Sequence, residues 1–269
     1  MLMSMLIEYE KLLISKGLSK NTIEIYMRCA QKYEEYKKKT EVSDYAKAYL
    51  DSLCNQYKLG TVNLYIIATN KYINFLGETQ NRMTLVKVQH NTSLENVISL
   101  EDYKKLMNHA LVTGREKYYY ILFTLAYTGI RISELKYFRV DTINRGYINI
   151  TNKRKNRDIY IPDILIDKLL HYCDKNDISE GVIFQGCNGK AISREAVWMM
   201  LQKFANELGI PREKVHPHSF RHFFAKSYIK KYGDIAELAD ILGHSSLETT
   251  RIYTMTTTEE KRKKLNELL

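Results

Sequence analysis

Two short stretches near the end of the sequence carry most of the side chains whose types point to chemistry. "HPHSFRHFF" starts at His216 and "ILGHSSLETTRIYT" ends at Thr254, and together they hold four of the seven histidines, two arginines and Tyr253. Arginine stays charged and matches a phosphate with two parallel N–H donors. A tyrosine hydroxyl becomes a useful nucleophile when neighbouring groups activate it. The pattern therefore favours a site in which one phosphate is held against one phenol.

The sequence lacks the motifs by which many other phosphate enzymes bind a nucleotide or a metal. It contains no G-x-x-x-x-G-K-[ST] loop, no H-E-x-x-H, no G-x-G-x-x-G after a strand and no dense acidic cluster. Any phosphoryl chemistry must therefore run on side chains, with arginines in place of a metal. We expect no cofactor, neither metal nor ATP.

Single residues in these stretches also have ordinary interpretations. His218 and Arg221 are three positions apart, so on a helix they share a face and can address one ligand. His216 and His222 read more naturally as ordinary surface or core histidines.

A further arginine stands at a predicted helix boundary. Gly129 in "AYTG" can end one helix before "RISEL" starts the next, which places Arg131 at a helix N-terminus, a favourable site for an anion. The alternative is an ion pair with Glu134, and the two interpretations are compatible.

The charge of the chain points to a polyanionic partner. The 269 residues include 41 Lys and Arg against 31 Asp and Glu, a formal net charge of +10, which fits nucleic acid or a merely solvated basic surface. Residues 1–90 hold 13 basic and 9 acidic residues and the remainder 28 and 22, so both halves can face the same polyanion.

The cysteines and the apolar runs indicate a cytoplasmic protein. The four cysteines are far apart and form no C-x-x-C pair, which disfavours a zinc site or disulfides and fits a reducing compartment. No signal-like leader opens the sequence. The longest apolar run, "YYYILFTLAYTGI", is 13 residues, short of the roughly 20 of a membrane span, so no membrane is expected.

Periodicity predicts a mainly helical chain with one small antiparallel sheet, in two domains. Apolar residues recur at helical spacing in four segments, near residues 3–16, 20–33, 42–57 and 60–77. The predicted domains are a helical bundle over 1–80, a linker over 81–94 and a second domain over 95–269.

The second domain is predicted to begin with a capping box and to contain one hairpin. "SLED" gives the capping box, and "YINIT" (147–151) and "RDIYIP" (157–162) alternate as strands around the basic tip "NKRKN". Further helices are predicted near residues 163–175, 193–209 and 217–231.

In this order, "TGIRISEL", the basic hairpin, "HSFRH", "LGHSS" and "TTRIYT" resemble the tyrosine recombinase or phage integrase family, particularly Xer-type recombinases and mobile-element integrases and resolvases. The resemblance covers roughly residues 95–258. It implies a two-domain DNA clamp in which the N-terminal bundle binds core DNA and the second domain is catalytic. It also implies six catalytic residues, which are Arg131, Lys153, His218, Arg221, His244 and Tyr253.

The resemblance assigns a role to each of these residues. The arginines bind the phosphate, His218 assists proton transfer, His244 hydrogen-bonds the phosphate, and Tyr253 attacks to form a 3′-phosphotyrosine. The hairpin lysine is the general acid for the leaving 5′-oxygen. This hairpin lacks the family's usual neighbours and is one residue longer, so Lys155 stays an alternative to Lys153.

The family also implies partners. They are double-stranded DNA, a homo-tetramer on two duplexes and, in some members, an accessory DNA-bending or directionality protein. The segment 258–269 reads as an amphipathic tail helix that docks on a neighbouring protomer or packs on its own. Lys155, Arg194 and Gln202 are the expected DNA contacts.

Two other functions fit parts of the pattern. One is a DNA-binding protein of the same fold that no longer cuts, which the full set of catalytic residues disfavours. The other is a type IB topoisomerase, which the compact first domain and "LGHSS" disfavour. Salt-dependent DNA binding would not separate the three, because all contact phosphates.

Overall fold

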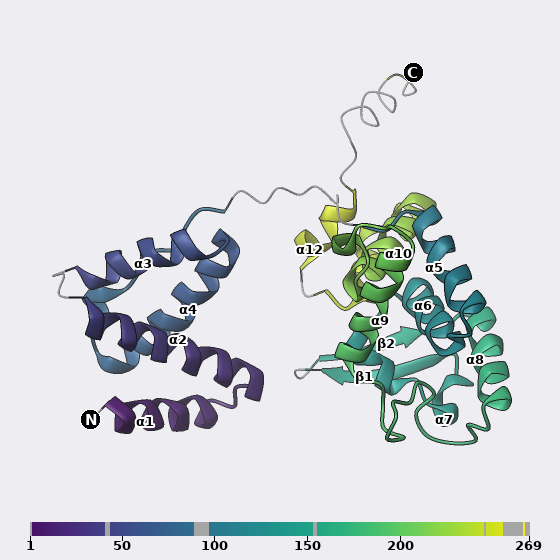
Figure 1. Ribbon diagram of the computed structural model, residues 1–269, viewed down its shortest axis with the longest axis horizontal. Coiled ribbons are helices and arrows are strands. Elements are labelled where there is room, and N and C mark those ends of the chain that lie inside the picture. Colours follow the sequence, from purple (N-terminus) through teal and green to yellow (C-terminus); the bar gives the residue numbers. More distant parts are fainter. Residues whose placement is uncertain are drawn as a thin grey trace. The chain divides into compact units, whose positions relative to one another are not determined.

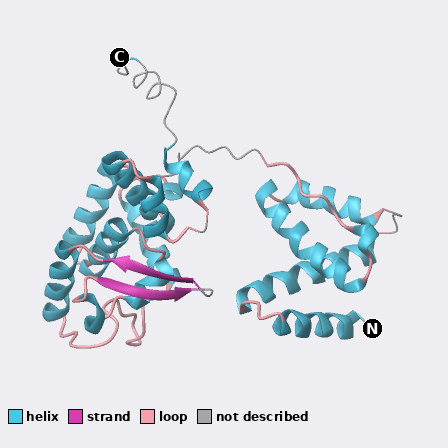
Figure 2. Ribbon diagram, turned by 180° about the vertical axis from the view of Figure 1, so that it is seen from behind, coloured by secondary structure: helices cyan, strands magenta, loops and turns pink. Residues whose placement is uncertain are grey.

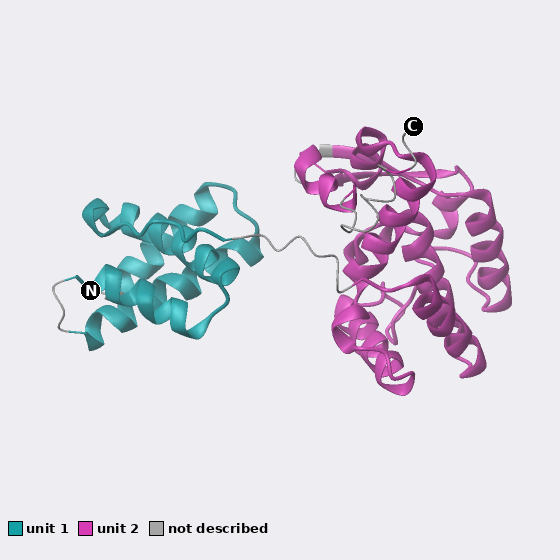
Figure 3. Ribbon diagram, turned by 90° about the horizontal axis from the view of Figure 1, so that it is seen from above, with its two compact units in different colours: residues 1–91 teal, residues 92–269 magenta. Residues whose placement is uncertain are grey.

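A computed structural model describes residues 2–40, 44–88, 97–152, 155–244, 246–254 and 266. The chain divides into two compact units, residues 1–91 and 92–269 (Figure 3). Both are helical, and the second also holds a two-stranded antiparallel sheet (Figure 2). The expected mainly helical fold with one small antiparallel sheet is confirmed. Among the helices of these ranges, none has the length and apolar character needed to cross a membrane.

The first unit is built from four helices that pack around a tyrosine-rich core (Figure 1). Its elements are α1 Leu2–Ser15, α2 Lys20–Lys39, α3 Tyr45–Gln56, α4 Leu59–Leu76 and the 3₁₀ helix η1 Thr79–Asn81. Ser19 caps α2 by accepting a hydrogen bond from N of Thr22 (3.3 Å), and the left-handed Gly77 ends α4. Tyr33 and Tyr72 are fully buried. All four predicted helical segments are present.

The chain continues along this bundle after α4. Asn63 Nδ2 donates to O of Val86 (2.9 Å), and N of Val86 donates back to Asn63 Oδ1 (2.9 Å). Asn70 forms the same two-way pair with Met83, at 2.7 and 2.9 Å, and Met83 is buried. Residues 82–88, which the sequence places in a linker, therefore pack as part of the first unit. The rest of the predicted linker, residues 89–94, is not among the described residues, which resume at Val97.

The second unit holds the remaining elements around one large core and a smaller cluster that includes Tyr253. They are α5 Leu100–Val112, α6 Glu116–Thr128, η2 Ile132–Tyr137, α7 Val140–Ile143, β1 Tyr147–Asn152, β2 Lys155–Tyr160, α8 Asp163–Lys175, α9 Arg194–Glu207, η3 Arg212–Lys214, α10 Pro217–Tyr232, α11 Ile235–Leu242, α12 Leu247–Arg251 and η4 Ile252–Thr254. The predicted capping box opens α5, since Ser99 and Asp102 exchange hydrogen bonds of 3.0 Å. Most of α6 is buried, as its apolar run requires, and it packs against α5, α8 and α10.

The hairpin has one face on the core and one in solvent. Tyr147 pairs with Tyr160 and Ile150 pairs with Arg157. Ile150 and Ile159 are buried, whereas the two tyrosines are exposed. Because directly opposed residues point to the same side of a sheet, Arg157 shares the core-facing side with Ile150.

Candidate active site

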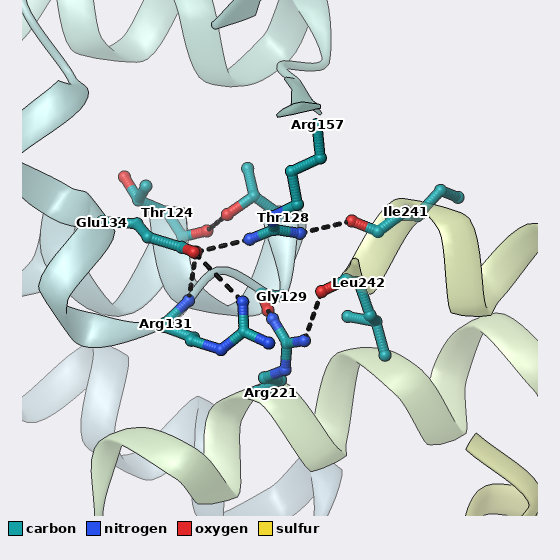
Figure 4. Close-up of polar contacts among 9 residues, drawn as sticks. All are labelled: Thr124, Thr128, Gly129, Arg131, Glu134, Arg157, Arg221, Ile241 and Leu242. Carbon is teal, nitrogen blue, oxygen red and sulfur yellow. Dashed lines mark hydrogen bonds and ion pairs between the residues drawn. The ribbon is translucent and has the colours of Figure 1, made fainter. Parts of the chain in front are cut away.

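Arg221 on α10 is the buried positive charge of the site. Its side chain is 1% exposed, and its Nη1 donates to O of Gly129 (2.7 Å) while Nη2 donates to O of Leu242 (2.5 Å) (Figure 4). Burial lowers its pKa to about 10, and nearby Arg131 and Arg157 act in the same direction. The guanidinium therefore stays charged at neutral pH. A bound anion would stabilise this buried positive charge.

Arg131 precedes η2 and faces solvent with part of its guanidinium. The side chain is 40% exposed, its Nη1 lies 3.2 Å from Glu134 Oε1, and its backbone N donates to Glu134 Oε2 (2.8 Å) (Figure 4). The expected ion pair is confirmed. The predicted helix is η2, a six-residue 3₁₀ helix, and Glu134 accepts the backbone N–H of its N-cap residue Arg131.

Tyr253 is buried against α10 and contacts a histidine that was expected to be ordinary. Its side chain is 5% exposed, and its hydroxyl lies 2.8 Å from Nδ1 of His222. Burial, followed by nearby His218, lowers the pKa of His222 to about 4, so this imidazole is neutral at pH 7. Burial raises the pKa of Tyr253, and Arg221 opposes that shift. His222, expected to be an ordinary surface or core histidine, is thus the hydrogen-bond partner of Tyr253.

His218 lies one helical turn before His222. The two ring centroids are 4.3 Å apart at an interplanar angle of 71°. Burial lowers the pKa of His218, and the charges of Arg221 and Arg131 act in the same direction. His218 is thus close to both arginines, on the same helix as one of them.

His244 follows the end of α11 and lies beside the tyrosine. Its ring is nearly parallel to that of Tyr253, with centroids 6.5 Å apart, and its Nδ1 lies 2.7 Å from Oγ1 of Thr250. Burial lowers its pKa to about 4, and Arg221 and Arg131 add to this. Arg131, His218, Arg221, His244 and Tyr253, predicted from separate stretches of sequence, therefore come together in one region.

The other predicted contacts are less uniform. Lys153 lies outside the described residues. Lys155 begins β2, and its side chain is likewise outside the described part. The side chain of Arg194 is exposed at the start of α9, next to Glu195.

The prediction of Gln202 as a DNA contact is corrected. This residue is only 9% exposed, its Nε2 donates to O of Val215 (2.7 Å), and its Oε1 accepts from Nε of Arg212 (2.9 Å). These bonds hold the chain between α9 and α10. A side chain so occupied is not placed to read DNA, and we withdraw it as a DNA contact.

The comparisons with known proteins agree with this architecture. A lambda integrase dimer solved on its COC′ core site has a TM-score of 0.75 to this chain at 18% identity, with 94% of each chain covered, which shows a shared fold. Tyrosine recombinase XerA of Pyrococcus furiosus is 28% identical over 257 residues, which cover 93% of this chain and 88% of XerA. Tyrosine recombinase XerD of Staphylococcus aureus is 25% identical over 279 residues, with 94% of each covered. The fold is thus that of the tyrosine class of DNA recombinases.

The sequence pattern of the phage integrase family matches residues 96–260, more than half of the chain. The chain belongs to the phage integrase family, and the expected tyrosine recombinase is confirmed.

Two polar residues that support this region were not among the expected site residues. Oγ1 of Thr250 lies within hydrogen-bonding distance of Nδ1 of His244. In the sequence, only its place between the histidine and tyrosine motifs indicated this role. Arg157 bonds to Glu134 and to the end of α11. In the sequence, this role was indicated by the spacing of Arg157, which alternates with Ile159 and Ile161 on the apolar side of a predicted strand.

Proposed function

We propose that Tyr253 is the nucleophile with which this site-specific DNA recombinase cuts and rejoins DNA strands, for integration, excision or resolution of DNA. One observation carries the proposal. The hydroxyl of Tyr253 is hydrogen-bonded to His222 and lies near the charge of Arg221, and its ring lies beside that of His244, although these residues belong to three different segments. Phosphate-binding and proton-accepting groups around one phenol are what attack on a phosphodiester requires.

Arg131 and Arg221 bind the scissile phosphate. Arg131 reaches it from the partly exposed side, and Arg221 supplies a charge fixed by two carbonyls. Because both are held before the substrate arrives, they stabilise the extra negative charge of the pentavalent transition state without a reorganisation cost. His218 lies beside them to assist proton transfer, and His244 hydrogen-bonds a phosphate oxygen.

The cleavage step is an exchange of one ester for another. The phenol of Tyr253 gives its proton to Nδ1 of His222, and its oxygen forms a bond to phosphorus. The bond from phosphorus to the 5′-oxygen breaks, and that oxygen takes a proton from the hairpin lysine, Lys153 with Lys155 as the alternative. The phosphoester energy is conserved in the 3′-phosphotyrosine, so a 5′-hydroxyl of a second duplex can reverse the step and exchange strands.

Both units clamp double-stranded DNA, and four protomers assemble on two duplexes in the cytoplasm. The excess of basic residues in both halves supports DNA as substrate. Structural relatives support it too, since XerH has been solved bound to its difH substrate, with a TM-score of 0.70. Arg194 is an exposed contact to this DNA. The tail at 258–269, which lies outside the described residues apart from Asn266, docks on the next protomer, and an accessory DNA-bending or directionality protein is a further partner.

A covalent trapping assay in EDTA tests the nucleophile. Labelled duplexes that flank the gene, nicked so that the cleaved end diffuses away, are incubated with the protein and separated on a denaturing gel. We expect an adduct from the wild type and from Tyr232→Phe, an exposed tyrosine of α10, but none from Tyr253→Phe. An adduct that persists in Tyr253→Phe would refute the assignment. Specific DNA binding by the wild type without any adduct would favour a DNA-binding protein that does not cut.

A further inference from the structure

Arg157 occupies a position where a strand usually places an apolar residue. It lies opposite Ile150 and in register with Ile159, both buried, and its own side chain is only 13% exposed. Burying a guanidinium costs free energy unless hydrogen bonds and an opposite charge compensate. The contacts of this side chain therefore indicate why it is there.

The guanidinium joins the hairpin to two other elements. Its Nη2 forms a short ion pair with Oε2 of Glu134 on η2, and its Nη1 donates to O of Ile241 near the end of α11 (2.6 Å) (Figure 4). Both terminal nitrogens point into the protein. Both terminal nitrogens of Arg157 thus already have protein acceptors, unlike the partly exposed Arg131, whereas its buried Nε has no hydrogen-bond partner among the described residues.

Glu134 is shared by both arginines. It is 2% exposed, and it accepts from the backbone N and Nη1 of Arg131 as well as from Arg157. We call these three residues, Arg131, Glu134 and Arg157, the arginine bridge. The two bonds from Arg131 to Glu134 do not involve Arg157, so we expect them to persist without it. The hairpin, by contrast, is joined to this bridge through Arg157.

The turn before His244 presses on the stem of the same arginine. Gly243 has a left-handed backbone (φ +62°), and a Cβ at this position would lie 2.3 Å from Cδ of Arg157. Only glycine lets the chain pass so close. The neighbouring Leu242 carbonyl holds Arg221 (Figure 4), so this turn, the hairpin and η2 meet at one side chain.

We propose that Arg157 is a positioning residue that fixes the hairpin against η2 and the end of α11, and thereby sets where the hairpin delivers its proton. The inference rests on the proposed function, because the candidate general acids Lys153 and Lys155 precede Arg157 by four and two residues on the same hairpin. Loss of Arg157 leaves Arg131 paired with Glu134 and Arg221 held by its carbonyls. Phosphate binding and attack are retained, and protonation of the leaving 5′-oxygen becomes slow.

A change of leaving group separates this role from a general loss of stability. In a duplex whose scissile 5′-oxygen is replaced by sulfur, attack by Tyr253 breaks a phosphorus–sulfur bond and releases a thiolate. A thiol has a pKa of about 8.5, far below that of an alcohol, so the sulfur departs without a proton. A defect in proton delivery therefore disappears with the sulfur substrate, whereas a defect in phosphate binding or attack does not.

The experiment measures single-turnover cleavage of the oxygen and sulfur duplexes at saturating protein. We expect Arg157→Ala and Arg157→Lys to cleave the oxygen duplex roughly 10- to 100-fold more slowly than the wild type and the sulfur duplex at close to the wild-type rate. Lysine keeps the charge but cannot donate to Glu134 and Ile241 with the same fork. If Arg157→Ala does not fold, the milder Arg157→Lys variant provides the test.

Two controls fix the interpretation. Asp158→Asn alters the opposite face of the same strand, where Asp158 accepts from Asn149 (2.9 Å), and should leave the ratio of the two rates unchanged. Glu134→Gln weakens Arg131 as well and should slow both substrates. Equal slowing of both substrates by the Arg157 variants, or no slowing, would overturn the inference about Arg157. The proposed function would still stand in that case, provided that the wild type forms the Tyr253 adduct. A wild type that forms no adduct with either duplex would overturn both.

Discussion

The hydroxyl of Tyr253 and Nδ1 of His222 lie 2.8 Å apart, and His222 directly follows Arg221 in the sequence. Successive residues of a helix point about 100° apart, so one turn of α10 sends Arg221 to the carbonyls of Gly129 and Leu242 and His222 to the tyrosine. The same turn thus holds the proposed phosphate-binding charge and the partner of the proposed nucleophile. A shift of α10 would move both together.

Replacing His222 by asparagine should slow cleavage while keeping the fold. Asparagine can hydrogen-bond the phenol but cannot take its proton, and a general base contributes typically 10²–10⁴-fold, so we expect a loss of about 100-fold or more. The measurement is the single-turnover rate of adduct formation between pH 5 and pH 9.

The matched control for that variant is His216→Asn. His216 caps α10 by accepting from N of Ser219 (3.1 Å), and asparagine is an equally good cap, so this variant should cleave normally. Equal rates in both variants and the wild type would show that His222 does not accept the proton.

Acid should destabilise the fold through two histidines. Burial lowers the pKa values of His222 and His244 to about 4, against an ordinary 6.5, and the charges of Arg221 and the other histidines around them act the same way. The unfolded state therefore binds more protons between pH 6.5 and pH 4. Their contribution is fully present above pH 6.5 and is lost as the pH falls towards 4, by at most about 1.4 kcal/mol per pH unit for each group.

Urea unfolding at pH 7, 6 and 5 measures this loss. The His222→Asn and His244→Asn variants should each show a smaller fall in the free energy of unfolding than the wild type across that range. A wild-type free energy that stays constant from pH 7 to pH 5 would contradict the lowered pKa values.

Arg221→Lys should be far more damaging than its conservative chemistry suggests. One ammonium cannot satisfy the carbonyls of Gly129 and Leu242 and also present a fork to phosphate. We expect cleavage to fall roughly 10²–10³-fold and the free energy of unfolding to fall by about 1–3 kcal/mol. Arg139→Lys, at an exposed pair with Asp141, should match the wild type in both measurements. Wild-type cleavage by Arg221→Lys would exclude the role of a bidentate charge.

Much of the site was predictable because its residues sit in short motifs with fixed order. Tyr253, nine residues after His244, and the His218/Arg221 spacing identify the family from sequence alone. Local signals also fixed several element ends, such as the capping box at Ser99 and the left-handed glycine that ends α4. These features depend on neighbours within a few residues of each other.

What escaped prediction depends on closure in three dimensions. His222 contacts Tyr253 only because η4 packs on α10, and the two residues are 31 positions apart in the sequence. Gln202 looked like an exposed polar residue on a helix, but the segment between α9 and α10 folds over it and its amide satisfies buried backbone. Arg157 could have been noticed in the sequence, because a charge on the apolar side of an alternating strand requires a buried partner. The sequence does not reveal that Glu134 is that partner.

The close approach of Gly243 to Arg157 gives a last prediction, in which strain and overlap can be separated. Gly243→Ala places a Cβ 2.3 Å from Arg157 Cδ in a left-handed backbone, whereas Gly233→Ala has a similar backbone (φ +75°) and nothing within 4 Å of the new Cβ. Both variants should lose about 1–2 kcal/mol of unfolding free energy to the left-handed conformation. Only Gly243→Ala should also displace Arg157 and the turn that carries His244, and so lower the rate of adduct formation. If the two variants lose stability equally and cleave alike, the turn yields to the methyl group and its contact with Arg157 does not control the reaction.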